Sequence, residues 1–135
     1  MVGIIIIAHG DLAQALHHAV EHVLGKQRQM EFINVAADSD PVALQHQLDR
    51  CIDQCDGGNG VILCADMFGG TPCNVALGRL DPEKIDILSG ISLPSLITIA
   101  SERSQIADPT ALARKGAASG RRYLCMASTM LKPGA

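Results

Sequence analysis

The residues best suited to chemistry are a histidine and an aspartate, each at the end of an apolar run. His9 follows the run Val2–Ala8, and Asp66 follows the run Val61–Ala65. If both runs are parallel strands, the two side chains reach the same edge of one sheet. A neutral imidazole is a nucleophile, and a neighbouring carboxylate can fix its tautomer and stabilise positive charge on the ring. The pair therefore predicts a histidine that carries a phosphoryl group.

A glycine turn directly after Asp66 adds groups that can hold an anion. It reads Met67-Phe68-Gly69-Gly70-Thr71-Pro72, and Thr71 is expected to cap a helix that has Pro72 in its first position. Backbone N–H groups at a helix start attract phosphate, and glycine permits close approach. We expect Gly69, Gly70 and Thr71 to bind the phosphate. The turn lacks both the Walker sequence and the Gly-x-Gly-x-x-Gly pattern, so no nucleotide site is expected.

Metal binding is a weaker interpretation of the same residues. Asp66 could hold Mg²⁺, but one carboxylate makes a poor metal site. His18 and His22 have a spacing that can chelate a metal on a helix, but no third ligand is evident. Cys51 and Cys55 fit core positions better than ligand positions. We expect neither a metal nor a cofactor.

Strand patterns alternate with helix patterns along the chain. Strands are expected over 2–8, 30–36, 61–66 and 84–89, with a short strand-like segment over 121–128. Helices are expected from a capping box at Asp11–Gln14 to Gly25, and over 41–56, 71–80, 94–104 and 109–120. Four strand-then-helix units predict an α/β fold: a mainly parallel four-stranded sheet with helices on both faces.

Length and composition restrict the class of protein. The 135 residues predict a single domain over 1–135, with a flexible tail over 130–135. A net charge of −3 and 2% aromatic residues argue against nucleic-acid binding. The sequence shows no signal peptide and no apolar run long enough to span or insert into a membrane. Five cysteines, mostly within apolar patterns, suit a reducing compartment, and we expect a cytoplasmic protein.

Three blocks of this sequence together resemble the mannose-type enzyme IIA of the bacterial sugar phosphotransferase system. They are the apolar strand ending in His9-Gly10, the segment Asp66–Asn74, and Ser89-Gly90-Ile91-Ser92-Leu93-Pro94. The resemblance implies that His9 accepts a phosphoryl group from the phosphohistidine of the carrier protein HPr, while Asp66 orients it. It also implies a site wall that includes Gly10, Met67, Phe68, Ser92 and Pro94.

The resemblance further implies a partner that receives the phosphoryl group, and a second copy of the chain. The acceptor would be a IIB protein. Family members are usually homodimers in which the C-terminal strand, here 121–128, lies antiparallel in the sheet of the other subunit. Three other functions stay open at this point. The chain could be a regulatory protein whose phosphorylation gates binding to a partner, a phosphoryl donor to a dihydroxyacetone-kinase system, or a small-molecule enzyme of flavodoxin-like architecture.

Overall fold

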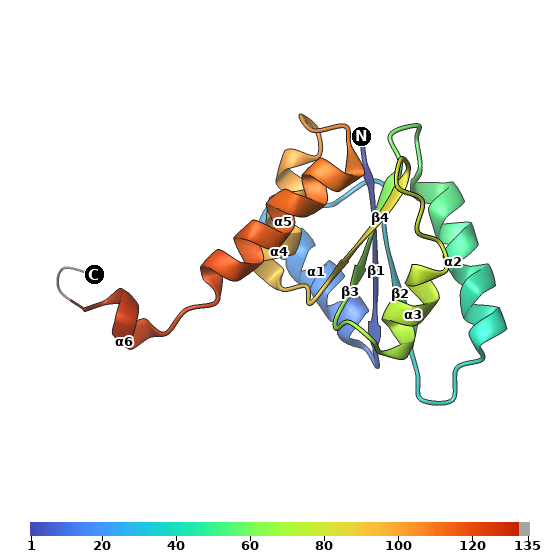
Figure 1. Ribbon diagram of the computed structural model, residues 1–135, viewed down its shortest axis with the longest axis horizontal. Coiled ribbons are helices and arrows are strands. Elements are labelled where there is room, and N and C mark those ends of the chain that lie inside the picture. The colour runs from blue at the N-terminus through green and yellow to red at the C-terminus, as the bar shows by residue number, and fades with distance from the viewer. Residues whose placement is uncertain (133–135) are drawn as a thin grey trace.

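The sheet consists of four parallel strands, as the sequence predicts. The computed structural model describes residues 1–132, and its strands are β1 (Gly3–His9), β2 (Met30–Val35), β3 (Val61–Ala65) and β4 (Ile85–Ser89). Their order across the sheet is β2-β1-β3-β4, and every neighbouring pair is parallel. Figure 1 shows the strands running side by side through the centre of the molecule. The strand-then-helix alternation therefore predicted the α/β class correctly.

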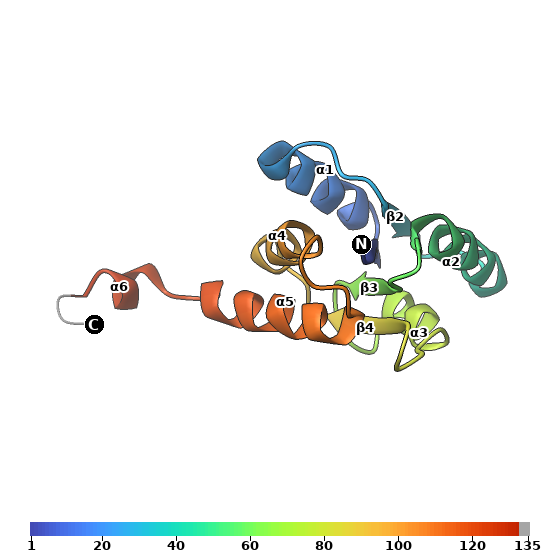
Figure 2. The ribbon, with the colours of Figure 1, turned by 90° about the horizontal axis from the view of Figure 1, so that it is seen from above.

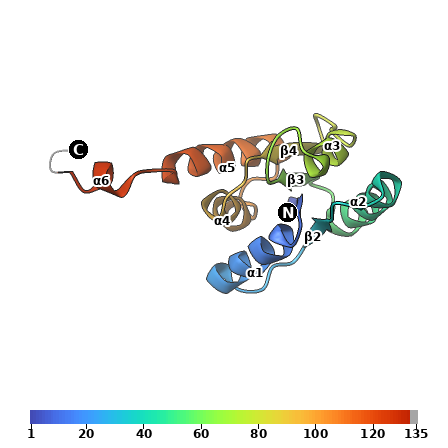
Figure 3. The same cartoon turned by 90° about the horizontal axis from the view of Figure 1, so that it is seen from below.

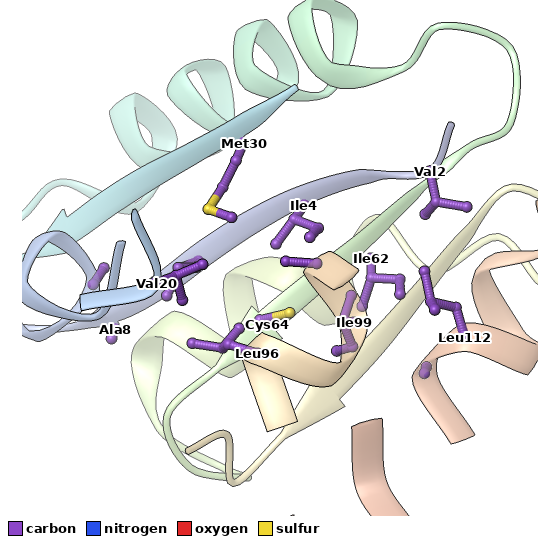
Figure 4. Packing of buried hydrophobic residues seen from close by; sticks show 14 residues of the cluster. Val2, Ile4, Ala8, Val20, Met30, Ile62, Cys64, Leu96, Ile99 and Leu112 are labelled. Atoms are coloured by element: carbon purple, nitrogen blue, oxygen red, sulfur yellow. The ribbon is translucent and has the colours of Figure 1, made fainter. Parts of the chain in front are cut away.

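The central strand β1 supplies side chains to two separate cores. Ile4 and Ile6 belong to one buried cluster, whereas Ile5 and Ile7 belong to the other. All four isoleucines are fully buried, because successive side chains of a strand point to opposite faces and both faces are covered. Figure 4 shows the first cluster, in which Ile4 of β1 lies close to Ile62 of β3. An uninterrupted apolar run is thus what a central parallel strand requires.

Helices cover both faces of the sheet. Their bounds are α1 (Leu12–Leu24), α2 (Pro41–Cys55), α3 (Thr71–Leu77), α4 (Leu93–Glu102), α5 (Pro109–Tyr123) and α6 (Ala127–Met130). Val20 of α1, Leu96 of α4 and Leu112 of α5 join the first cluster, whereas α2 and α3 pack on the second. Figures 2 and 3 show the resulting three layers, with α1, α4 and α5 on one side and α2 and α3 on the other.

Two of the expected helix caps differ in the structure. Asp11 occupies the N-cap position of α1 but makes no capping hydrogen bond. Instead, Asn34 of β2 accepts a hydrogen bond from the backbone N–H of Gln14 at 3.2 Å and donates one to the Gln14 side chain at 3.1 Å. Thr71 is the first residue of α3, and Gly70 precedes it in the N-cap position. A polar group from the neighbouring strand thus replaces the local cap that the sequence predicts for α1.

The C-terminal part of the chain is more helical than expected. Helix α5 continues past Gly120 to Tyr123, and 127–130 form α6, so only 124–126 have extended backbone. Gly120 lies within α5 and packs against the start of α4: a Cβ built on Gly120 would lie 3.5 Å from the Cβ of Ser95. Arg121 and Arg122 favour this ending, since basic residues stabilise the last turn of a helix. The predicted strand over 121–128 is therefore wrong at both its ends.

The segment after α5 extends away from the rest of the molecule. Figures 1 and 2 show α6 separated from the sheet and its helices. Large apolar side chains of this segment are exposed, among them Leu124 at 87% and Leu131 at 82%. The expected flexible tail begins at Met130, which ends α6, and its last residues 133–135 lie outside the described part of the chain.

A buried arginine joins three segments on the amino-terminal side of the sheet. Arg103, at the end of α4, is 2% exposed. Its guanidinium donates hydrogen bonds to the backbone carbonyls of Val2 at 3.2 Å, Gln29 at 3.0 Å and Arg28, and to the side chain of Gln27. Because these acceptors come from the starts of β1 and β2, Arg103 fixes α4 against the sheet.

Among residues 1–132, no helix has both the length and the apolar character that a membrane span requires.

Candidate functional site

The strand order brings His9 and Asp66 to one place. The chain leaves β1 toward β2 on one side, whereas β3 and β4 lie on the other side, so the order reverses between β1 and β3. The space beyond the carboxyl ends of two such strands is where open α/β sheets bind ligands. His9 is the last residue of β1, and Asp66 directly follows β3. The structure therefore brings together the two side chains that the sequence analysis pairs.

One carboxylate oxygen of Asp66 contacts His9 twice. Asp66 Oδ2 lies 2.8 Å from His9 Nδ1 and accepts the His9 backbone N–H at 3.1 Å. Since a carboxylate only accepts hydrogen bonds, Nδ1 carries the proton and Nε2 keeps a free lone pair in the neutral ring. Asp66 Oδ1 accepts the N–H of Met67 at 3.1 Å. The arrangement fixes both the tautomer and the orientation of the imidazole.

The two side chains differ in exposure, which suits a group that must meet another protein. The His9 side chain is 49% exposed, whereas that of Asp66 is 12% exposed. Partial burial acts to raise the pKa of Asp66, but the hydrogen bonds from the His9 ring and backbone outweigh it. The pKa of Asp66 therefore lies below its ordinary value of 3.8. The carboxylate stays charged across the physiological range and can stabilise positive charge on the ring.

Gly70 lies against the reactive side of the imidazole. A Cβ at this position would lie 2.7 Å from His9 Cε1 and 3.2 Å from His9 Nε2. The backbone φ of Gly70 is −82°, which any residue adopts, so the requirement for glycine here is one of space. Gly69 differs, because its φ of +88° is in the region that favours glycine. The two glycines thus serve different purposes in the same turn.

Backbone donors of the same turn are available to an anion. In the part of the chain that the structure describes, the N–H groups of Gly69, Gly70 and Thr71 have no backbone or side-chain acceptor. Thr71 is exposed, so its hydroxyl is accessible as well. These are the groups that the sequence predicts to hold phosphate, and one of the three residues, Gly70, lies beside His9 Nε2. Their use by a phosphate stays a prediction.

A surface cavity of about 440 Å³ adjoins His9. His9, Gly10 and Thr71 form part of its wall. The rest comes from the end of β2 and the loop after it: Val35, Ala36, Ala37, Ser39 and Pro41. No sequence motif marks this loop, although β2 pairs with β1 up to His9 and Val35. The general rule that ligands bind beyond strand ends applies to β2 as well and would have included it.

The other expected wall residues occupy two different positions. Met67 and Phe68 are 54% and 71% exposed and follow Asp66 directly, so they lie at the rim of the site. Ser92 and Pro94 belong to the start of α4, where Ser92 forms a capping box with Ser95. Neither Ser92 nor Pro94 lines the cavity beside His9. Their predicted contribution to the wall remains untested.

The alternative metal and thiol sites receive no support from the geometry. Within residues 1–132, no three His, Cys, Asp or Glu side chains are grouped to hold a metal ion. The thiols of the apolar runs are structural: burial raises the pKa of Cys64 to about 12, and burial, together with nearby Glu31, raises the pKa of Cys55 to about 12. Cys73 is fully buried in the second core cluster.

Comparison with known protein families identifies the chain. A family model described as "PTS system fructose IIA component", EIIA-Man, matches residues 3–114. The chain belongs to the EIIA-Man family. A fructose-specific EIIA component of the phosphotransferase system from Bacillus subtilis is 26% identical over 108 residues, which are 79% of this chain and 74% of that protein.

The similarity extends to longer proteins and to solved structures. The mannose-specific EIIAB component of Escherichia coli is 26% identical over 81% of this chain, and the matched region spans 33% of that protein's length. A crystal structure of phosphotransferase component EIIA from Streptococcus agalactiae superposes with a TM-score of 0.86 at 26% identity, covering 96% of this chain and 99% of that one. Members of the EIIA-Man family thus share this fold over nearly its whole extent.

Proposed function

We propose that this EIIA-Man family member is a phosphoryl carrier in which His9 accepts a phosphoryl group from phospho-HPr and passes it to a IIB protein. The observation that carries the proposal is the imidazole itself: Asp66 binds Nδ1, and Nε2 is left free on a half-exposed ring. Both partners of such a relay are cytoplasmic proteins, so we place this chain in the cytoplasm. We also propose that residues 1–135 act as one IIA domain.

Each transfer exchanges one phosphorus–nitrogen bond for another. The lone pair of His9 Nε2 forms a bond to phosphorus while the bond to the donor's ring nitrogen breaks, and that electron pair stays on the donor ring. The Nδ1–H remains hydrogen-bonded to Asp66, which stabilises the positive charge that develops on the His9 ring. N–H groups of Gly69, Gly70 and Thr71 would hold the phosphoryl oxygens. The reaction needs positioning and charge stabilisation from these residues and no cofactor.

The relatives favour this role over the alternatives that the sequence also allowed. They are components of sugar phosphotransferase systems, among them fructose-specific and mannose-specific proteins. A regulatory role and a donor role toward dihydroxyacetone kinase gain no comparable support. A flavin or nucleotide enzyme is disfavoured further, because the lining of the cavity beside His9 includes no Phe, Tyr or Trp side chain on which a planar ring could stack.

Phosphorylation of His9 is tested by the mass of the intact protein. We expect incubation with phosphoenolpyruvate, enzyme I and HPr to add one phosphoryl group to the wild-type chain and none to His9→Ala. The label should be lost in acid and kept in base, because phosphohistidine is acid-labile. His18→Ala serves as the control, since His18 is also exposed but lies on α1, and it should be labelled normally. Label that persists in His9→Ala would refute the proposal.

A homodimer joined through the C-terminal segment is the second part of the proposal. The outer edge of β4 has no neighbouring strand among the described residues, and Leu124, Met126 and Leu131 are exposed beyond α5. An unpaired strand edge readily binds a further strand. A groove of about 410 Å³ lies between β4 and the end of α5, and Ile87, Gly116 and Leu124 are among its lining residues. We propose that the extended residues 124–126 of a second copy pair with β4.

A further inference from the structure

A second cavity, of about 340 Å³, lies at the amino end of the sheet. Its volume falls in the range of about 300–1,000 Å³ that is typical of small-molecule sites. Because all four strands are parallel, their amino ends lie at one edge of the sheet, whereas His9 lies at the other. We call it the amino-edge cavity. Its lining comes from three segments: Met1 before β1, the turn Lys26-Gln27-Arg28 between α1 and β2, and Ala100, Arg103 and Ser104 around the end of α4.

The amino-edge cavity is lined by three cations and by no carboxylate. The cations are Lys26, Arg28 and Arg103. Lys26 and Arg28 are exposed, and their side chains form no hydrogen bond or ion pair with any of residues 1–132. In contrast, the guanidinium of Arg79 is paired with the carboxylate of Asp49. The lining thus presents positive charge that no ion pair neutralises.

Arg103 is the most constrained of the three cations, because it is buried without a carboxylate partner. Its terminal nitrogens donate to the Gln27 side chain and to the carbonyls of Val2, Arg28 and Gln29, which are all uncharged acceptors. The remaining donor, the Nε–H, has no acceptor within residues 1–132, and Nε is not fully enclosed. Burial lowers the pKa of Arg103, so a bound anion would stabilise its charged form. One N–H of a buried cation is therefore left for a ligand in the cavity.

The negative ends of two helices balance part of this positive charge. The carboxyl ends of α1 and α4 both lie beside the cavity, and each carries the equivalent of about −0.5 charge. Glu21 of α1 adds one negative charge near Lys26. Together these groups contribute about −2 against the three cations in the lining. A surplus of about one positive charge remains, so the cavity as a whole favours an anion.

We infer that the amino-edge cavity binds a small-molecule oxyanion, through a phosphate or carboxylate group held by the Arg103 Nε–H, Lys26 and Arg28. A guanidinium suits both groups, because its N–H donors form charge-assisted hydrogen bonds with their oxygens. Ser104 is exposed in the lining and adds a hydroxyl donor. Such a ligand would connect the α1–β2 turn to the end of α4. The inference goes beyond the carrier function and does not depend on it.

NMR titration with inorganic phosphate at constant ionic strength tests the site on the intact chain. We expect the resonances of the Arg103 Nε–H and the Ser104 amide to shift with saturation in the millimolar range, because two of the three cations are exposed to water. Lys26→Gln/Arg28→Gln should weaken this binding by about tenfold or more, since it removes the two charges that accompany Arg103.

Arg50→Gln/Lys84→Gln is the matched control for this double variant. It removes the same two types of charge from exposed positions that do not line the amino-edge cavity, and it should bind phosphate as the wild type does. Equal weakening in the control would overturn the inference, because it would show that only the total charge matters. An Arg103 Nε–H resonance that phosphate does not move would overturn it as well.

Residue-resolved shifts also separate this cavity from the glycine turn beside His9, which we propose holds phosphate too. Shifts confined to the amides of Gly69, Gly70 and Thr71 would overturn the inference and leave the carrier site supported. Malonate in place of phosphate identifies the ligand group. If only one of the two anions shifts the Arg103 Nε–H, the site belongs to that class of ligand; if both do, it accepts oxyanions of either class.

Discussion

At the scale of single residues, one oxygen atom of Asp66 performs two tasks. It accepts hydrogen bonds from the His9 ring at 2.8 Å and from the His9 backbone at 3.1 Å. The first contact selects the tautomer, and the second holds the end of β1 against the turn after β3. A change at Asp66 therefore affects the local fold as well as the reactivity of the imidazole.

This double contact makes stability depend on pH through Asp66. Because the folded state lowers the pKa of its carboxyl below 3.8, the stabilisation is complete above that value and is lost as pH falls through the lower folded-state pKa. We expect the difference in unfolding free energy between wild type and Asp66→Asn to be constant above about pH 5 and to shrink below it. Urea unfolding from acid to neutral pH measures the difference, and a difference that grows toward low pH would contradict the assignment.

Gly70 gives a test of how closely the site is packed around the ring. In Gly70→Ala, the new Cβ would lie 2.7 Å from His9 Cε1, so the ring must move away from Asp66. We expect phosphoryl transfer to slow by about tenfold to 100-fold, because small misplacements of a reacting group are costly. Single-turnover transfer from phospho-HPr measures the rate.

The unfolding free energy of Gly70→Ala should change little, since His9 is half exposed and can turn outward. Gly120→Ala is the control, because its Cβ would make ordinary contacts at 3.5 Å and 3.6 Å with α4 and its cap. It should keep the transfer rate and gain about 0.5–1 kcal/mol of stability from better helix propensity. Wild-type transfer in Gly70→Ala would show that the ring does not need its present position.

At the scale of secondary-structure elements, the positions of the four sheet strands along the chain and their parallel arrangement were predictable from the apolar periodicity and from the Gly, Pro and Asp residues between elements. The alternation of Ile4–Ile7 between two cores requires a buried central strand, and Asp40 and Asp108 cap α2 and α5. The local sequence did not predict a cap or a close helix contact when a residue distant in the chain supplies the partner. Asn34 caps α1 from β2, and Gly116 lets α5 approach Ile99 so closely that a Cβ on this glycine would lie only 2.6 Å from Ile99 Cδ1. Such contacts depend on the assembled fold.

The same distinction applies to the candidate site, where some residues were predictable from the local sequence and others are brought together only by the fold. His9, Asp66 and the glycine turn were predictable because they lie at or just after the ends of strands. The cavity wall after β2 was not identified, since Ala36, Ala37 and Pro41 carry no reactive group that would draw attention. Ser92 and Pro94 were placed in the wall by resemblance, but they start α4 and do not line the cavity.

Arg103 is the side chain through which α4 holds the starts of two strands. Replacing it by methionine keeps much of its apolar stem but leaves the carbonyls of Val2, Arg28 and Gln29 without this donor. We expect Arg103→Met to lower the unfolding free energy by about 2–4 kcal/mol, measured by urea denaturation. Exposed Arg114→Met should change it by less than about 0.5 kcal/mol. Equal effects of the two substitutions would show that the carbonyl contacts contribute nothing.

At the scale of the whole molecule, the segment beyond α5 contrasts with the packed α/β body. It extends outward with exposed leucine and methionine side chains, as Figure 2 shows for the path of the chain. Apolar surface of this kind is stabilised by burial against another chain. The unpaired edge of β4 and the adjoining groove offer a matching surface on a second copy.

Ending the chain after Tyr123 tests this association. We expect sedimentation velocity to show a dimer for the full chain and a monomer for the shortened one, because the proposed exchanged strand is removed while α5 is kept. Phosphorylation of His9 by the relay should persist in the shortened chain, since none of the site residues is lost. A dimer that survives the truncation would place the interface elsewhere.

The register of β1 has a consequence for how the sequence can vary. His9 pairs with Val35 at the last position of one ladder, whereas Gly3 pairs with Val61 at the first position of the other. Inserting or deleting one residue between Gly3 and His9 would exchange the isoleucines of the two cores and turn the imidazole toward the opposite helical layer. We therefore expect the length of this strand to tolerate no single-residue change, whereas the β2–α2 loop can vary in length without inverting any side chain.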